Sequence, residues 1–218
     1  RGLNLKNQPK AVKAGIAAEL ATLESLLQKL IQDNLSQEQQ AHHQVMQQQL
    51  ETLKQYYENQ TASVLKWATY RDRKMAENVM WVKQHAQSKN SKLLIWAHNG
   101  HLRNSNLKMG KYLKQANPDY FILAQDFISG HTKSNKQREL HYPISKDEPL
   151  FANYFLDRDG AMFFVNFRET DFQQSDLAQY IQKNPRIHNE GRTKNTLKLQ
   201  PRKQVDAIII HRITSPKF

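Results

Sequence analysis

Lys92-Leu93-Leu94-Ile95-Trp96-Ala97-His98-Asn99-Gly100-His101 is the stretch that most constrains the fold. Its apolar run, Leu93 to Trp96, predicts a strand buried on both faces of a sheet. The run ends at once in two histidines, an asparagine and a glycine, which is typical of a turn. Because open α/β sheets bind ligands at the carboxyl ends of their strands, this turn is a candidate site.

Apolar runs and helical patterns alternate through the rest of the chain. This alternation predicts an α/β fold with a mainly parallel sheet flanked by helices. Residues 125–145 are expected to form a long loop or a small antiparallel excursion, and residues 183–203 a basic loop. The other expected strands cover residues 120–124, 161–166 and 205–210, and the helices between them cover residues 107–115 and 171–183.

Three helices are expected before the central stretch, over residues 11–34, 37–60 and 62–88. The first two have apolar stripes at steps of three and four and predict an N-terminal helical hairpin, residues 1–60. Residues 61–218 are expected to form the α/β unit and to make one structural domain together with the hairpin. His42 and His43 in the second helix are expected to be exposed.

The third helix places polar residues among core positions. Arg71, Met75, Asn78 and Val82 follow one another at steps of four, three and four, so they share one face. A buried guanidinium or amide needs hydrogen bonds or a polar cavity. Arg71 and Asn78 therefore either anchor the fold or line a site, and the spacing favours neither.

The chain of 218 residues has a net charge of +12, which is unevenly spread. Residues 1–58 are neutral, with six basic and six acidic side chains, and the excess follows them. The field favours anionic partners, but the charges are dispersed and few aromatic side chains accompany them, so nucleic acid is disfavoured as a partner. The sequence has no cysteine, which excludes thiolate metal sites. It has no apolar run long enough for a membrane span.

The chain has no motif for several common chemistries. A phosphate-binding glycine pattern, a Gly-x-Ser-x-Gly elbow and a His-Glu-x-x-His metal helix are all missing from the sequence. His98 and His101 remain, and neutral imidazoles can move protons or stabilise an oxyanion. Two histidines are half of a usual zinc set, so no metal and no cofactor are expected. From the residue types alone, a structural or solvent-exposed role for the two histidines is slightly favoured over a catalytic one.

A resemblance adds to this interpretation. Trp96-Ala97-His98-Asn99-Gly100-His101 resembles the Trp-x-His-Asn-x-His signature of the erythromycin esterase family, most closely over residues 65–130. The other similar segments are Arg71-Asp72, Met75-Ala76 and Asn78 in the preceding helix, Met109-Gly110, Phe127 with Gly130, and Asp206-Ala207-Ile208.

The resemblance implies hydrolysis of an ester, in well-known members the lactone ring of macrolides, which confers antibiotic resistance. It implies that His98 and His101 lie in the catalytic cleft, that Asn99 positions the turn, and that Arg71, Asn78 and Met75 support the cleft wall. Water would be activated by histidine, without a covalent intermediate. The expected partner is a small-molecule ester or lactone.

The same resemblance implies a longer family fold. Residues 1–60 do not match the family's Gly-Glu-x-x-His-Gly type motif, so the chain resembles the C-terminal part of the family. A missing N-terminal half, or another chain, is therefore a further expected partner. The alternative to a hydrolase is a catalytically incomplete binding module on the same fold. The compartment is left open, with the cytoplasm slightly favoured over export.

Overall fold

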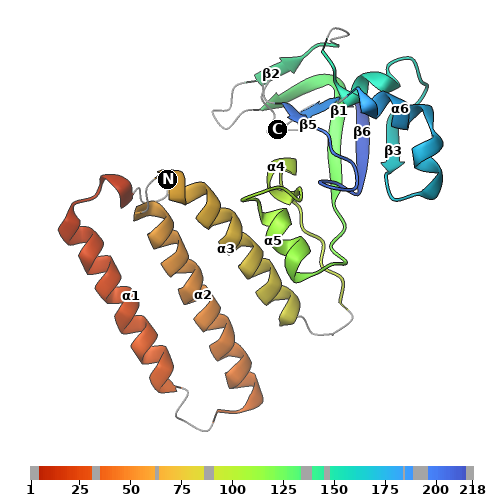
Figure 1. The fold of residues 1–218 in the computed structure, drawn as a ribbon. Coiled ribbons are helices and arrows are strands. Elements are labelled where there is room, and N and C mark those ends of the chain that lie inside the picture. Colours follow the sequence, from red (N-terminus) through yellow and green to blue (C-terminus); the bar gives the residue numbers. More distant parts are fainter. Residues whose placement is uncertain are drawn as a thin grey trace. The chain divides into compact units, whose positions relative to one another are not determined.

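The computed structural model describes residues 5–30, 35–61, 64–85, 91–133, 139–144, 148–183, 185–188 and 196–214. The chain divides into two compact units, residues 1–81 and 82–218, and each is described by itself. Figure 1 labels most of their helices and strands. The third helix groups with the first two in this division, and the expected domain boundary at residue 60 stays a prediction.

The first unit is helical, as the apolar stripes predict. Its second helix begins at a capping box, in which the Ser36 N–H donates to Gln39 Oε1 at 2.9 Å and the Gln39 N–H donates to Ser36 Oγ at 3.3 Å. The ends of the expected helices at residues 31–34, 62–63 and 86–88 lie outside the described residues. The elements are η1 (Leu5–Asn7), α1 (Lys10–Leu30), α2 (Gln37–Thr61) and α3 (Val64–Gln84).

Polar side chains join these helices. His43 is buried and its Nε2 bonds to the Leu27 carbonyl of α1 at 2.8 Å, so its expected exposure was wrong. On the other side of α2, Asn78 of α3 accepts a hydrogen bond from Gln48 at 2.8 Å and donates one to Gln55 at 3.1 Å. The amide of Asn78 thus anchors α3 to α2.

The second unit contains a four-stranded sheet with the order β2-β1-β6-β3. Only the central pair, β1 with β6, is parallel, so the prediction of a mainly parallel sheet was wrong. The physical reason is that two neighbouring pairs run in opposite directions. β2 follows β1 in the chain and forms the expected antiparallel excursion, and β3 lies beside β6 and runs antiparallel to it. The strands are β1 (Leu123–Lys133), β2 (Glu139–Tyr142), β3 (Met162–Asn166) and β6 (Ala207–Thr214).

Short elements complete this unit. The expected helix at 171–183 is a 3-10 turn followed by a short α-helix, and the expected basic loop contains a two-stranded antiparallel ribbon of β4 and β5. Residues 184 and 189–195 of that loop lie outside the described part. The elements are α4 (Asn99–Leu102), α5 (Met109–Ala116), η2 (Phe151–Phe155), η3 (Thr170–Gln174), α6 (Asp176–Gln182), β4 (Arg186–His188) and β5 (Thr196–Lys198).

The apolar run before α4 does not form the expected buried strand. Residues 91–98 have no regular secondary structure, and Leu94 and Trp96 are 87% and 81% exposed. Among the described residues no strand pairs with this run, so its side chains have no layer against which to pack. An apolar run indicates a preference for burial, but the partner segments decide whether burial occurs.

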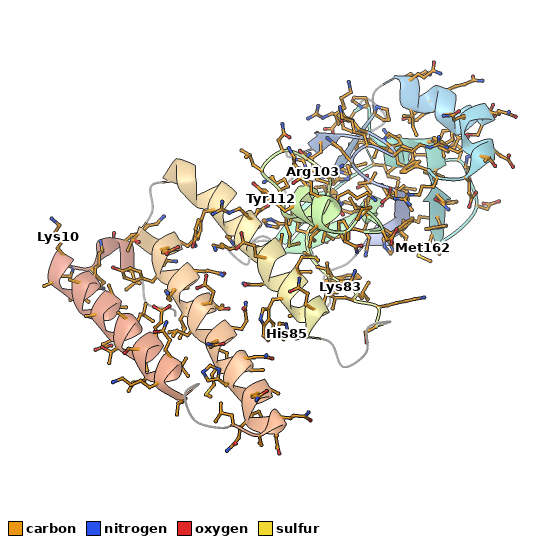
Figure 2. The ribbon with its side chains drawn as sticks, turned by 60° about the horizontal axis from the view of Figure 1, so that its bottom comes forward. Lys10, Lys83, His85, Arg103, Tyr112 and Met162 are labelled. Carbon is orange, nitrogen blue, oxygen red and sulfur yellow. The ribbon has the colours of Figure 1, made fainter. Side chains whose placement is uncertain are left out.

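The two faces of the sheet differ. On one face Ala124, Asp126, Ile208 and Ile210 are buried. The opposite face, here called the open face, carries residues of intermediate exposure and three strongly exposed apolar residues. These three are Met162 (58%), which Figure 2 labels, Phe164 (59%) and Ile213 (72%). No helix in the described ranges is long and apolar enough to cross a membrane.

Helix α4 packs directly on the backbone of α5. At Gly110 an added methyl carbon would lie 1.8 Å from the Leu102 carbonyl oxygen and 2.5 Å from that of Arg103. Because both atoms belong to the backbone, no rotamer change could relieve the overlap. Gly110 therefore fixes how closely the turn at residues 98–102 approaches α5.

We expect Gly110→Ala to lower the free energy of unfolding by about 1–3 kcal/mol or more. The added methyl group would overlap the Leu102 carbonyl, and the backbone would have to move to relieve the overlap. The matched control is Gly15→Ala in α1, where an added methyl meets no atom within 4 Å. That control should stabilise its helix by up to about 1 kcal/mol. Urea unfolding followed by circular dichroism would measure both, and equal unfolding midpoints for Gly110→Ala and the wild type would contradict this account.

Candidate functional site

Helix α4 is fixed to β1 through the side chain of Asn99. The Asn99 amide donates to the Gln125 carbonyl oxygen at 2.5 Å, and the Gln125 N–H donates to Asn99 Oδ1 at 3.1 Å. In a sheet, a neighbouring strand would form the same two hydrogen bonds with the N–H and carbonyl groups of Gln125. One side chain thus takes the place of a neighbouring strand at the outer edge of β1, the edge that faces away from β6.

His98 caps the short helix with its ring. The Gly100 N–H donates to His98 Nδ1 at 3.0 Å, and the His98 backbone is extended. A ring nitrogen can accept a hydrogen bond only when it carries no proton, so the proton of the neutral ring lies on Nε2. His98 therefore presents an N–H donor, and its side chain is exposed.

Tyr120 supports the end of α4. Its hydroxyl donates to the Leu102 carbonyl oxygen at 3.3 Å, one residue after His101. Burial, with a smaller contribution from the charge of Asp206, raises the pKa of the Tyr120 hydroxyl to about 12. The hydroxyl thus remains a donor throughout the physiological range. Asp206 accepts a hydrogen bond from the Ile122 N–H at 2.8 Å. It also forms an ion pair with Arg168, with 2.8 Å between Arg168 Nε and Asp206 Oδ1.

A buried carboxylate–imidazole pair is formed by Asp126, the residue of β1 that follows Gln125. The Nδ1 of His188, the last residue of β4, lies 2.7 Å from Oδ1 of Asp126. The same oxygen accepts hydrogen bonds from the backbone N–H groups of Phe127 at 2.9 Å and His188 at 3.3 Å. The side chain of Asp126 has no exposed surface, whereas that of His188 is 8% exposed.

Aromatic rings enclose His188. The Phe127 ring is stacked on the imidazole, with centroids 4.4 Å apart and planes inclined by 7°. The Tyr142 ring meets the imidazole edge to face at 5.2 Å. The imidazole is thus held in one orientation by packing as well as by its bond to Asp126.

Asp126 is costly to ionise in this position. Burial raises the pKa of its carboxyl group, and the hydrogen bonds from His188 and the two backbone N–H groups offset only part of that rise. Its second oxygen, Oδ2, is buried and accepts no hydrogen bond from the residues that the structure describes. The charge of Asp126 is therefore stabilised mainly by His188.

These groups share one edge of one strand. The backbone groups of Gln125 and Phe127 point to the same edge of β1, because successive residues alternate. Asn99 occupies the first position and the Asp126–His188 pair the second, about 6.7 Å along the strand. On the open face beside them, His211 Nε2 lies 3.3 Å from Gln125 Oε1.

The structure brings only some of the predicted site residues together. His98, Asn99 and His101 are consecutive or nearly so on α4, and His101 is half-buried. Arg71 and Met75, both half-buried, and Asn78 belong to α3 in the other unit. The proximity of these three to the histidines stays a prediction.

Sequence reasoning missed Asp126, His188, His211 and Gln125. The available signal was a charged residue inside the apolar run Ile122–Ile128, because a carboxylate there needs a partner. In the described part of the chain, no group of three or more histidine or acidic residues is placed to hold a metal ion.

The comparisons with known proteins agree with the fold. The model of a family described as erythromycin esterase matches residues 2–214. A crystal structure of a protein from Bacillus cereus is similar with a TM-score of 0.74 and 18% identity, covering 97% of this chain and 54% of its own. A crystal structure described as a succinoglycan biosynthesis protein is similar with a TM-score of 0.70 and 17% identity, covering 97% of this chain and 52% of its own. This chain thus spans about half the length of both structures. No curated protein matches it.

We expect Asn99→Ala to destabilise the protein by about 1–3 kcal/mol, because it leaves the N–H and carbonyl groups of Gln125 without their partners. Hydrogen exchange of the Gln125 amide should accelerate. The control is Asn106→Ala, an exposed change expected to stay within about 0.5 kcal/mol of the wild type. Unchanged exchange at Gln125 would show that the Asn99 side chain does not hold this edge.

Asp126 should make stability depend on pH. Because its folded pKa is raised above the ordinary value near 3.9, the native state keeps a proton that the unfolded chain releases just above about pH 4. Wild-type stability should therefore fall as pH rises through that range, relative to Asp126→Asn, which cannot titrate. Urea unfolding from about pH 4 to 7 measures the difference, with exposed Asp159→Asn as the control. A difference that grows in favour of the wild type with rising pH would refute the assignment.

Proposed function

The chain belongs to the erythromycin esterase family, and from this membership and the geometry of α4 we propose that it is a hydrolase that opens esters or lactones with water. Macrolide lactones are the substrate class that the family name suggests. The single observation that carries the proposal is the ring orientation of His98. Its Nδ1 accepts the Gly100 N–H, so the proton of the neutral ring lies on Nε2.

An ester carbonyl oxygen gains negative charge when water attacks the carbonyl carbon. A fixed N–H donor aimed at that oxygen stabilises the transition state more than the ground state, and such a donor contributes about 10²–10³-fold in kcat. In this proposal His98 is that donor. The cap keeps the proton of its neutral ring on Nε2, because moving it to Nδ1 would break the bond to Gly100.

The other residues take supporting roles in the proposal. His101, one turn after His98, shares the same cleft and contacts the substrate or the attacking water. Asn99 holds both histidines on β1, as its two bonds to Gln125 support. A supporting role for Arg71 and Met75 is kept as part of the proposal, whereas the Asn78 side chain bonds to α2. The substrate is a small molecule, and the second half of the longer family fold, or another chain, completes the cleft.

The alternative is a binding module on the same fold that is catalytically incomplete. Such a module would bind the lactone without consuming it.

The test uses the chain with a macrolide lactone and with p-nitrophenyl butyrate in oxygen-18 water. We expect mass spectrometry to show the gain of one labelled water, with the label in the new carboxyl group. His98→Asn should keep the helix cap, because asparagine caps helices well, but lose the donor at the Nε2 position. Its kcat/KM should fall by about 10²–10³-fold.

The matched control is His42→Gln, an exposed histidine of α2, which should retain wild-type kcat/KM. Binding of the lactone by calorimetry without any gain of water would decide for the binding module. Hydrolysis that survives in His98→Asn would remove His98 from the mechanism.

A further inference from the structure

We propose that His131 and His141 form a binding site for a divalent transition-metal ion, with Cu²⁺ bound most tightly, on the hairpin of β1 and β2. Both residues belong to the unit of residues 82–218. Their side chains are exposed, so an ion can reach them directly from the solvent. This inference does not rest on the proposed hydrolase function.

The register of the hairpin places the two histidines directly opposite each other. β1 and β2 are antiparallel, and His131 is the partner of His141 in the ladder, one step from the pair Gly130–Tyr142. Opposed residues of an antiparallel pair point to the same face, with Cβ atoms about 4.5–5.5 Å apart. The backbone therefore fixes both imidazoles side by side on one face, which is the arrangement that a chelating pair requires.

The separation of the two rings matches that of two imidazoles on one metal ion. The ring centroids lie 4.6 Å apart, with planes inclined by 47°. A metal–nitrogen distance of about 2.0–2.1 Å, with a nitrogen–metal–nitrogen angle between the square-planar and tetrahedral values, places the centroids of two bound imidazoles about 4.5–5 Å apart. Rotation of the rings can thus bring one nitrogen of each to a common ion without a change in the backbone.

Contact between the two rings does not by itself account for the pair. Both imidazoles are exposed, so their contact excludes only part of their surface from water. Imidazoles that both carry a proton repel each other, and like charges directly opposite on a sheet are destabilising. A metal ion removes this repulsion, because it binds the lone pairs of neutral rings. Chelation would therefore make the juxtaposition favourable.

The donor set selects the kind of ion. Imidazole nitrogen suits Cu²⁺, Ni²⁺ and Zn²⁺, whereas Mg²⁺ and Ca²⁺ prefer oxygen ligands. Among the described residues no third histidine or acidic group joins the pair, so water would fill the other coordination positions. Two imidazoles with water suit the tetragonal coordination of Cu²⁺ better than a closed tetrahedral zinc site. The affinity of a given site for divalent ions also reaches its maximum at Cu²⁺.

A bound ion would cross-link two neighbouring strands at the end of the sheet. One ligand comes from β1 and the other from β2, which is the terminal strand in the order β2-β1-β6-β3. Because the pair is brought together by folding, an ion that binds it stabilises the folded hairpin by mass action. We therefore expect added metal to slow amide exchange in β2.

The first arm of the test adds CuCl₂ to the full chain and records electron paramagnetic resonance spectra. We expect nitrogen hyperfine structure from two imidazoles. In His131→Gln and in His141→Gln this structure should reduce to that of one imidazole or disappear. The Kd for Cu²⁺, measured by competition with a chromogenic chelator, should rise by about 10²-fold, because the second ligand no longer binds within the same molecule.

The matched control is His42→Gln, which changes an exposed histidine of α2 and should leave the spectrum and the Kd unchanged. The second arm uses ZnCl₂ and hydrogen exchange. Zn²⁺ should slow exchange of the β2 amides in the wild type and in His42→Gln, but not in His131→Gln or His141→Gln, because the cross-link needs both rings. Circular dichroism of the variants checks that these exposed substitutions leave the fold intact.

Three results would overturn the proposal. A wild-type spectrum with a single coordinating imidazole would show that the pair does not chelate. A two-imidazole spectrum that persists in both His131→Gln and His141→Gln would show that other residues hold the ion. A Kd for Cu²⁺ or a β2 exchange rate that responds to metal equally in the wild type and in folded His141→Gln would remove the cross-link.

Discussion

The outer edge of β1 is the constraint on which the candidate site depends. A strand edge exposes N–H and carbonyl groups that must find partners, and in the described residues no strand pairs with β1 between Leu123 and Ser129 on the side away from β6. Side chains take over instead. Asn99 bonds both backbone groups of Gln125, and Asp126 accepts the N–H of Phe127. The need to satisfy this edge therefore gathers polar residues from α4 and β4 along one line.

Chemistry follows from how those residues are held. Burial gives the Asp126–His188 pair a water-poor environment, while the side chain of His98 is exposed. In such a setting the hydrogen-bond partner of each ring, rather than the bulk pH alone, decides where its proton lies. Gln125 links the two sides further, because its backbone holds Asn99 and its side chain contacts His211. A single residue of β1 thus contacts both α4 and β6.

The sequence predicted local features well and long-range features poorly. The helices were found because an apolar stripe with a period near 3.6 is a property of consecutive residues. The directions of the strands were not predicted correctly, because β3 pairs with β6, a segment more than forty residues away in the sequence. The run Leu93–Trp96 was recognised as apolar, but its partners were assumed. Asp126 could have been flagged inside its apolar strand, whereas His188 lies 62 residues further on and no spacing rule connects the two. The turn of His98 was found because its residues are adjacent.

The attachment of Asn99 has a consequence for how this fold can diversify. Its two partners are the N–H and carbonyl groups of Gln125, which all residue types except proline possess. The side chain at position 125, and those of its neighbours on the open face, can therefore vary without moving the histidine turn. Substitutions can accumulate on the open face while the turn of His98 and His101 stays in register with β1, so the scaffold tolerates change there without losing the geometry of the turn.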